Sequence, residues 1–358
     1  MNQFIISRSR IVWGRKLAAS FLGLLGCFSA YAQQKPIHSQ YVLNNYLLNP
    51  AISGIESYAD VKISHRNQWT GIDGAPVTTT FTIHTPLGSD DDIQRINPSS
   101  YGKSGENVRG ERVNADYESP KSHHGIGLMA LNDRTGYLNR VSVYGTYAYH
   151  MPVAKKMTLS AGFMAGFSNT SLDRSKIVWG SLNPNDPAIG YNNNELSKFL
   201  PEVGAGLWLY SDVFYAGASV LNILPGKARF TNEQTYGMSY TPHFFFTGGY
   251  KFWLSDDVTA LPSVMIQLVQ PFTPQIHSNI KLQYRDLAWL GAGYRISDEL
   301  GGLTAMAGFN VSNTFNIGYA YDLSTSSRLR TYSKNTHEIM IGFLLNNRYG
   351  ELCPRQVW

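Results

Sequence analysis

A His-Glu pair near the C-terminus shares the first two residues of the His-Glu-x-x-His signature of zinc proteases. In that signature two histidines four positions apart bind zinc from one face of a helix. The position four beyond His337 is Ile341, so the second ligand is missing. The branched and aromatic residues from Ile339 to Phe343 recur at every second position, which is the period of a strand. His337-Glu338 is therefore predicted to begin a strand and to bind no metal.

A triple aspartate and a histidine pair are the other patterns of metal-binding residue types. Asp90-Asp91-Asp92 lacks the spaced oxygen ligands and the glycine of a calcium loop, so a solvated acidic loop is predicted. His123-His124 opens a predicted strand, where neighbouring side chains point to opposite faces and cannot share a metal. No Ser-His-Asp set can be argued from the chain, since each histidine has a strand or loop position. The sequence predicts no enzyme activity, no metal site and no cofactor.

The composition is unusual for a soluble enzyme. The 358 residues are 43% hydrophobic and 15% charged, with 33 glycines and 22 tyrosines, which is poor in charge and rich in aromatics. The net charge of +5 is dispersed and partly lies in the leader, so no nucleic-acid partner is predicted. Beyond the leader, no apolar run approaches the roughly 20 residues of a spanning helix.

Residues 1–32 have the layout of a secretory signal peptide. Basic residues precede an apolar run at 17–28, and a small-residue cleavage site follows at 30–32, which would leave Gln33 as the mature N-terminus. Lipoprotein processing at Cys27 is the alternative, because the residues before it resemble a lipobox. After cleavage Cys353 alone remains, so no intramolecular disulfide is predicted.

The mature chain shows strand after strand in which one face is apolar and aromatic and the other carries charges, amides and glycines. Fourteen strands are predicted, at 57–67, 76–86, 124–132, 138–151, 157–169, 200–210, 213–222, 241–254, 258–269, 276–285, 287–297, 302–311, 314–323 and 336–346. A secreted β-sandwich also alternates. The long strands, the sparse charge on the polar face and the aromatics near strand ends favour a transmembrane barrel in the outer membrane, contacting its lipid. Because lipid cannot satisfy an open sheet edge, the sheet must close.

An even number of strands places the N-terminus and the C-terminus of the barrel on the same side of the membrane, predicted to be the periplasmic side. The short turns at 211–212 and 286 then fall on that side, and the long loops at 170–199, 223–240 and 324–335 fall outside the cell. The long connection 87–123 falls on the periplasmic side, where turns are usually short. Either a pair of strands is missing from the prediction or this insertion contacts a periplasmic partner. Residues 347–358 are predicted to be a C-terminal tail.

The segment 33–56 is too apolar for a free tail and is predicted to pack into the barrel mouth or lumen. Gly-x-Gly pairs at 125–127, 204–206 and 291–293 lack the GxGxxG pattern and helix of a phosphate loop, and are predicted to let backbone or plug approach the barrel wall. Alternation directs a set of charged side chains into the lumen, where they must be hydrated or paired. They are Lys62, Arg66, Arg140, Glu202, Lys281, Arg285, Arg295, Asp322 and Glu338.

Three ordered stretches resemble the PorP/SprF family of outer-membrane proteins of the type IX secretion system in Bacteroidetes. The first lies at 40–51, the second at 66–76 and the third at 317–339. The residues that carry the resemblance are Asn49, Pro50, Arg66, Gln68, Trp69, Gly71, Pro76, Tyr319, Tyr321, Asp322, His337 and Glu338. The long 87–123 segment departs from the family's usual short link.

The resemblance implies an accessory of type IX secretion or gliding motility. Its partners would be a secreted cargo protein with a type IX sorting domain and other components of the export machinery. Aromatic residues in the predicted exterior loops are candidates for cargo contact, namely Trp179, Tyr191, Phe230 and Tyr236. The alternative is a porin-like transporter of small solutes, and a weaker one is an outer-membrane hydrolase.

Overall fold

The computed structural model describes the strands and most short connections of the chain. The described ranges are 41–88, 119–173, 197–224, 226–229, 237–255, 257–269, 273–285, 287–297, 301–312, 314–325 and 333–347. The predicted signal peptide, the acidic loop at 90–92 and the end of the predicted tail lie outside them. No helix in these ranges has the length and apolar character needed to cross a membrane.

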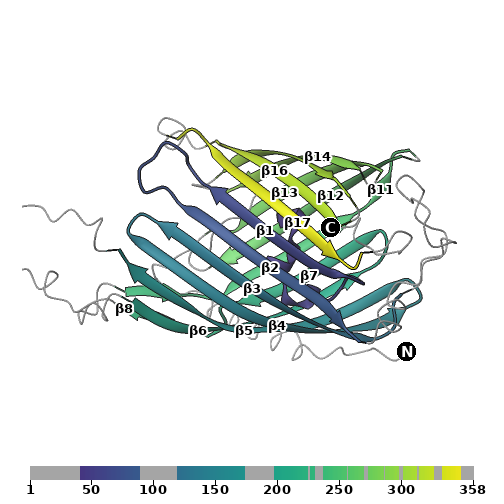
Figure 1. Ribbon diagram of the computed structural model, residues 1–358, viewed down its shortest axis with the longest axis horizontal. Helices are drawn as coiled ribbons and strands as arrows, with labels where there is room; N and C mark the ends of the chain where they lie inside the picture. Colours follow the sequence, from purple (N-terminus) through teal and green to yellow (C-terminus); the bar gives the residue numbers. More distant parts are fainter. Residues whose placement is uncertain are drawn as a thin grey trace, which may run out of the picture.

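The described chain is dominated by antiparallel strands that follow one another around a barrel (Figure 1). They are β1 (Ala59–Asn67), β2 (Val77–Leu87), β3 (His123–Thr135), β4 (Leu138–Ala154), β5 (Met157–Leu172), β6 (Ser197–Tyr210), β7 (Phe214–Leu221), β8 (Gly226–Arg229), β9 (Gly237–Tyr240), β10 (His243–Tyr250), β11 (Phe252–Trp253), β12 (Val258–Val269), β13 (Gln275–Tyr284), β14 (Ala288–Ile296), β15 (Gly302–Asn310), β16 (Phe315–Ser324) and β17 (Thr336–Leu345).

The sheet closes on itself at two junctions. The first strand pairs antiparallel with the last, from Ala59↔Leu345 to Asn67↔His337. The second junction joins β10 to β12 from His243↔Val269 onward. Since β10 and β11 form one wall strand interrupted at Lys251, the structure is a closed barrel of 14 strands, as predicted. Closure leaves no sheet edge in the lipid.

Two details differ from the sequence prediction. The predicted strand 241–254 is divided at Lys251 into β10, which pairs with β7 and β12, and β11, which pairs with β12. The predicted loop 223–240 contains a small hairpin, in which β8 pairs with β9 apart from the barrel sheet. Four-residue strands without a sustained apolar alternation give little sequence signal.

Alternation along each strand separates a lipid face from a lumen face. On β1, Ile63 on the outer face is 40% exposed, whereas Ser64 and Arg66 on the inner face are 4% and 1% exposed. The large exposed side chains on the wall are mostly Leu, Ile, Val, Phe and Tyr, which suit contact with acyl chains. The barrel therefore carries its apolar surface outward and its polar residues inward, the reverse of a water-soluble protein.

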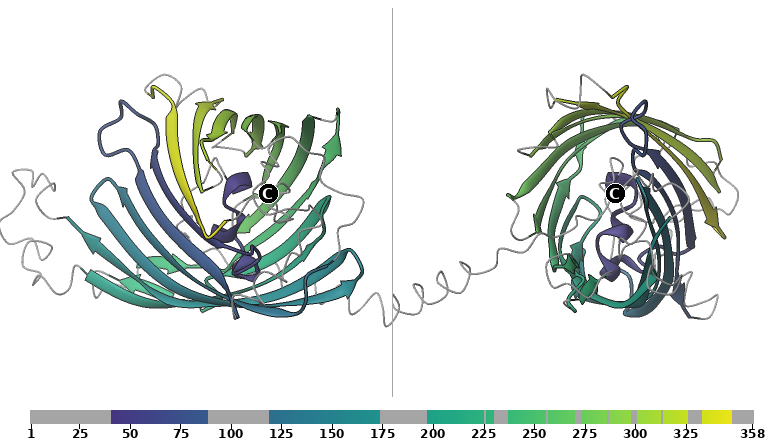
Figure 2. Two further views of the ribbon diagram at one scale, coloured as in Figure 1. Left: turned by 45° about the vertical axis from the view of Figure 1, so that its right-hand side comes forward. Right: turned by 90° about the vertical axis from the view of Figure 1, so that its left-hand side faces the viewer.

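The lumen is filled by the segment that precedes β1. Three short 3-10 helices, η1 (Tyr41–Leu43), η2 (Asn45–Leu47) and η3 (Pro50–Ile52), lie inside the ring of strands (Figure 2). We call residues 41–58 the plug. Most of their side chains are buried, and Tyr41, Tyr46 and Ala51 are at most 1% exposed. The predicted segment is 33–56, and the prediction that it packs in the barrel mouth or lumen is confirmed for its described part, residues 41–56.

The two ends of the barrel differ in the length of their connections. One end, here the long-loop end, carries the connections after β1, β5, β7 and β16. The other, the short-turn end, carries tight turns such as 155–156 and 311–314, and the connection 88–122 is its one long exception. The predicted long loops therefore lie at one end of the barrel and the predicted short turns at the other.

Candidate functional site

Glycines in the barrel wall allow the plug backbone to touch it. A Cβ built on Gly162 of β5 would lie 2.4 Å from the Cα and the N of Ala51 in η3. One on Gly125 would lie 2.7 Å from the Cα of Gly54. These distances are far below a van der Waals contact, so only glycine permits this approach. Of the predicted Gly-x-Gly pairs, Gly125, Gly127 and Gly206 lie against the plug, whereas Gly204 and Gly291 lie against the wall.

Hydrogen bonds fix the plug to strands on several sides of the lumen. The Asn49 side chain caps η3 by accepting from the N–H of Ala51 (3.0 Å) and also donates to the carbonyl of Leu207 on β6 (2.9 Å). Pro50 follows at the first helical position, where its missing N–H costs nothing. Ser160 of β5 donates to the Ala51 carbonyl at 2.6 Å. These contacts place the family residues Asn49 and Pro50 at the centre of the plug.

Three histidines bind the last turn of the plug near the short-turn end. The Nε2 atoms of His150 and His123 lie 2.9 Å and 3.1 Å from the carbonyls of Ser53 and Gly54. The Gly54 N–H donates to Nδ1 of His84 at 3.3 Å. The rings of His123 and His150 stack at 4.4 Å. Alternation places His84 and His150 on the polar face of their strands, and His84 also follows the second family-like stretch, but the sequence predicts no contact of either residue with the plug.

Two plug tyrosines remain protonated and serve as hydrogen-bonding groups. Burial raises the pKa of Tyr41 to about 12, and its hydroxyl donates to the carbonyl of His277 at 3.3 Å. Burial also raises the pKa of Tyr46, whose hydroxyl lies 2.6 Å from Oγ1 of Thr146 on β4. Because both phenols stay neutral at physiological pH, the plug is held by neutral hydrogen bonds here, without ion pairs.

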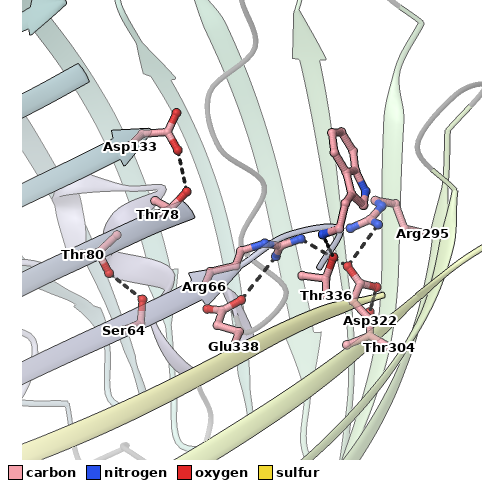
Figure 3. A network of polar contacts seen from close by, with 11 residues as sticks. Ser64, Arg66, Thr78, Thr80, Asp133, Arg295, Thr304, Asp322, Thr336 and Glu338 are labelled. Carbon is pink, nitrogen blue, oxygen red and sulfur yellow. Dashed lines mark hydrogen bonds and ion pairs between the residues drawn. The ribbon is translucent and has the colours of Figure 1, made fainter. Parts of the chain in front are cut away.

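Four charged side chains form a buried cluster in the lumen near the long-loop end (Figure 3). We call Arg66, Arg295, Asp322 and Glu338 the rim cluster. Arg66 lies between the two acids, with Nη2 3.3 Å from Oδ2 of Asp322 and Nη1 3.3 Å from Oε2 of Glu338. Arg295 reaches the same Asp322 oxygen at 3.1 Å, and Thr304 donates to the other oxygen at 2.8 Å.

The rim cluster is balanced in charge and closed to water. It joins β1, β14, β16 and β17 with two cations and two anions, and its side chains are 2–9% exposed. Charges so buried must be paired and hydrogen-bonded to be tolerated. Arg66 of β1 and Glu338 of β17 lie on the two strands that close the barrel, so the cluster links the first strand of the sheet to the last.

The family-like stretch 66–76 covers the last two residues of β1 and the loop 68–76, which we call the Trp69 loop. This loop is held against the β16–β17 connection. The N–H of Gln68 donates to the Pro76 carbonyl (2.9 Å), which closes the loop on itself. The N–H of Trp69 donates to Oγ1 of Thr336 at 3.1 Å, and the N–H of Thr70 to the carbonyl of Asn335 at 2.8 Å. The two connections thus form one structure at the long-loop end.

Trp69 has an unusual backbone conformation within this loop. Its φ is +52°, in the left-handed region that a bulky residue rarely adopts, and its side chain is half-buried. Gly71, two residues on, has φ +93°, which a glycine adopts without strain. Strain of this kind costs about 1–3 kcal/mol and gathers at functional sites. The loop around Trp69 is therefore a candidate for contact at the long-loop end.

The His-Glu pair lies on opposite faces of β17, as its predicted strand position implies. Glu338 points inward to Arg66, whereas His337 points outward and its Nδ1 lies 2.7 Å from the hydroxyl of Tyr319. The hydroxyl of Tyr321 accepts from Asn335 at 2.6 Å. Within the described ranges no three His, Cys, Asp or Glu residues are grouped as metal ligands would be. The outward His and Tyr side chains form part of an aromatic band near the barrel end.

Five predicted lumen charges lie outside the rim cluster, and one of them, Lys281, is 5% exposed. Arg140 forms an ion pair with Glu202, whose other oxygen accepts from the hydroxyl of Tyr144 at 2.7 Å. Lys62 lies 2.7 Å from Asp60. The prediction for Arg285 is wrong: it lies beyond the end of β13 with φ +49° and pairs with Asp257, and both side chains are about 40% exposed. A left-handed residue at the turn breaks the alternation on which the prediction rested.

The four aromatic residues predicted to contact cargo lie outside the described residues. They are Trp179, Tyr191, Phe230 and Tyr236.

Solved structures of other outer-membrane barrels resemble the fold. The toluene transporter TbuX of Ralstonia pickettii is 13% identical with a TM-score of 0.44, over 85% of this chain and 94% of that one. A mutant of the monoaromatic hydrocarbon channel TodX is 12% identical with a TM-score of 0.40, over 84% and 92%. A Rhodopseudomonas blastica porin mutant is 8% identical with a TM-score of 0.34, over 80% and 98%.

Sequence comparison points to a family. No curated protein matches the sequence. The family described as "Type IX secretion system membrane protein PorP/SprF" matches residues 30–343, which include the plug, the rim cluster and the Trp69 loop. The closed barrel with a lipid-facing apolar surface places the protein in the outer membrane. This chain belongs to the PorP/SprF family of type IX secretion system membrane proteins.

Proposed function

We propose that this protein supports the export or surface attachment of a specific secreted protein, as an accessory of the type IX secretion or gliding machinery. The observation that carries the proposal is the plug. A porin conducts solutes through an open, water-filled lumen, whereas here residues 41–58 cross the lumen and bond to strands on several sides. Together with the family membership, a filled barrel supports a role in binding proteins over one in passing solutes.

The long-loop end is the proposed surface for the secreted partner. Outer-membrane barrels usually carry their long loops outside the cell and their short turns in the periplasm. With this orientation the Trp69 loop and the loops that contain Trp179, Tyr191, Phe230 and Tyr236 face outward. Aromatic side chains give a large contact area with little rotamer entropy to lose, which suits recognition of a partner. The partner would be a cargo with a type IX sorting domain, gliding adhesins among them.

The short-turn end is the proposed surface for other components of the export machinery. With the same orientation, the long 88–122 connection lies in the periplasm among turns of two to four residues. A long connection among short turns is usually functional. This connection is therefore the proposed contact for the periplasmic machinery.

The test is a deletion of the gene, followed by proteomics of the cell surface and the medium and by an uptake assay for small solutes. We expect one or a few secreted proteins to be lost from the surface while uptake stays at the wild-type rate. Complementation with a variant in which the Trp69 loop is replaced by Gly-Ser residues should restore the barrel but not the lost protein. If uptake falls while every secreted protein still reaches the surface, the porin alternative replaces this proposal.

A further inference from the structure

A small apolar cavity of about 50 Å³ lies between the plug and the barrel wall. Plug residues Tyr41, Leu47 and Leu48 line one side of it. The rest of the plug lies between these residues and the short-turn end, where Gly54 bonds to His84. The cavity is therefore closed toward that end of the barrel. A group that enters it is bound, and is not transported.

The cavity lies toward the long-loop end. Leu221, which lines it, is the last residue of β7, and Gln267 is two residues from the end of β12. Both strands end at the long-loop end. Leu131 and Arg140, near the adjoining ends of β3 and β4, are half-buried, whereas the residues deeper in the cavity are nearly inaccessible to water. Access is therefore from the long-loop end, which is the proposed outer surface.

Three buried methionines from the barrel wall line the cavity. Met129 of β3, Met164 of β5 and Met265 of β12 are 4%, 1% and 3% exposed, and Phe245 of β10 lines the cavity beside them. Methionine is unbranched and polarizable, so its side chain adapts to the shape of a bound apolar group. Strands on opposite sides of the lumen contribute these side chains, so the cavity spans the space above the plug.

The charged residue at the cavity is already neutralised within the protein. Arg140 pairs with Glu202, and Glu202 also accepts from Tyr144. The lining is thus mainly apolar, and its polar groups are the Tyr41 and Tyr144 hydroxyls, Ser142, Gln267 and the paired Arg140. Such a lining selects an apolar ligand with a polar attachment at the mouth, since pockets of this kind use few polar groups to orient a largely apolar ligand.

The volume limits the size of the ligand. An engineered apolar cavity of about 150 Å³ binds benzene. The cavity here, at about 50 Å³, has a third of that volume, which suits the branched end of an aliphatic side chain and excludes an aromatic ring. We propose that this cavity binds an aliphatic side chain, of leucine size, presented by a polypeptide at the outer surface. This rests on the proposed function, because a secreted protein is what would present such a side chain there.

A binding experiment with a defined probe tests the cavity itself. The barrel, in lipid nanodiscs and labelled with ¹³C at the methionine methyl groups, is titrated with N-acetyl-leucinamide. We expect the signals of Met129, Met164 and Met265 to shift saturably, while those of Met306 and Met340, on the other side of the lumen, stay in place. N-acetyl-phenylalaninamide should bind at least tenfold more weakly. Unmoved signals, or equal shifts with both probes, would overturn the proposal.

Two blocking variants show whether the shifts arise in the cavity. Ser142→Leu places a leucine side chain where the serine lines the cavity, and should abolish the shifts. Ser168→Leu is the matched control, because Ser168 pairs with Ser142 across β4 and β5 but does not line the cavity. If Ser142→Leu does not give a folded barrel, Leu131→Trp at the half-buried mouth takes its place. Shifts that persist in a folded blocking variant would contradict the proposal.

The same variants in cells separate this proposal from the proposed function. The blocking variant should lower the surface amount of the protein that is lost in the gene deletion, by about tenfold, and Ser168→Leu should leave it unchanged. If the deletion removes that protein but the folded blocking variant retains it, the cavity proposal fails and the proposed function stands. If the deletion affects no secreted protein while leucinamide still binds, the proposed function fails, and a free apolar molecule replaces the polypeptide side chain as ligand.

Discussion

At the scale of single residues, the rim cluster has the largest electrostatic consequence. Arg66 holds two carboxylates that have almost no contact with water, and Arg295 shares one of them. Removing one partner of such a group leaves a buried charge without compensation, which is much more costly than the pair is stabilising. An exposed pair such as Arg285–Asp257 lacks this sensitivity because water replaces the lost partner.

Arg66→Ala is expected to destabilise the folded barrel by about 3–5 kcal/mol. The physical reason is that Asp322 and Glu338 then lose their shared cation in the lumen. A folded barrel resists detergent, so without boiling it migrates on a gel apart from the unfolded protein. The measurement is the denaturant concentration at which half of this folded band of the reconstituted protein is lost. Arg285→Ala is the control and should leave the midpoint within error of wild type. Equal midpoints for the two variants would show that the rim cluster is not a stabilising unit.

At the scale of elements, the plug and the wall fit each other through missing side chains. Gly162 and Gly206 face the lumen where η3 and its Asn49 cap pass, and a Cβ at either would overlap the plug. Gly145, on the lipid face of β4, meets no atom nearer than 3.9 Å from such a Cβ. Contact with the plug therefore requires glycine at positions 162 and 206, whereas no contact requires it at position 145.

Gly162→Ala is expected to destabilise the barrel by about 1–3 kcal/mol, the usual cost of adding a methyl group to a packed interior. Gly145→Ala should be neutral by comparison, since the added methyl faces lipid. Thermal unfolding in detergent, followed by the strand signal in circular dichroism, measures both. A neutral Gly162→Ala would mean that the plug leaves this position in solution, contrary to the contacts described.

At the scale of the whole molecule, closure and filling act together. The sheet has no free edge among its barrel strands, and the plug replaces the water that a barrel of this size would otherwise hold. The result is a structure that presents two loop surfaces, one on each side of the membrane, joined by a rigid wall. This arrangement suits a docking protein whose partners meet it at the ends.

The purified protein is expected to be electrically silent in planar lipid bilayers. Residues 41–58 occupy the lumen and are bonded to β2, β4, β5, β6 and β13, so no continuous aqueous path of porin width remains. Single-channel recording at moderate voltage, with a trimeric porin as positive control, measures this. Steady ohmic steps of porin size from most insertions would contradict the filled lumen.

The sequence by itself determined the strands, their two faces and the closed barrel. The side-chain period of a strand is a local property, so alternation can be read directly from the chain. Closure follows because lipid leaves no alternative for an open edge. The failures have local causes too, since a left-handed residue at Arg285 and a break at Lys251 interrupt the period without a sequence signal.

Only the tertiary structure decided which residues meet inside the barrel. Arg66 is separated from Asp322 by 256 positions and from Glu338 by 272, and their contact depends on the register of β1 against β17. Alternation places all three in the lumen but does not set that register. The contacts of the plug have the same origin, because the positions of Gly125 and Gly162 beside it depend on how the closed wall folds around it. The apolar cavity arises from the same packing, as its lining comes from strands that alternation alone cannot bring face to face.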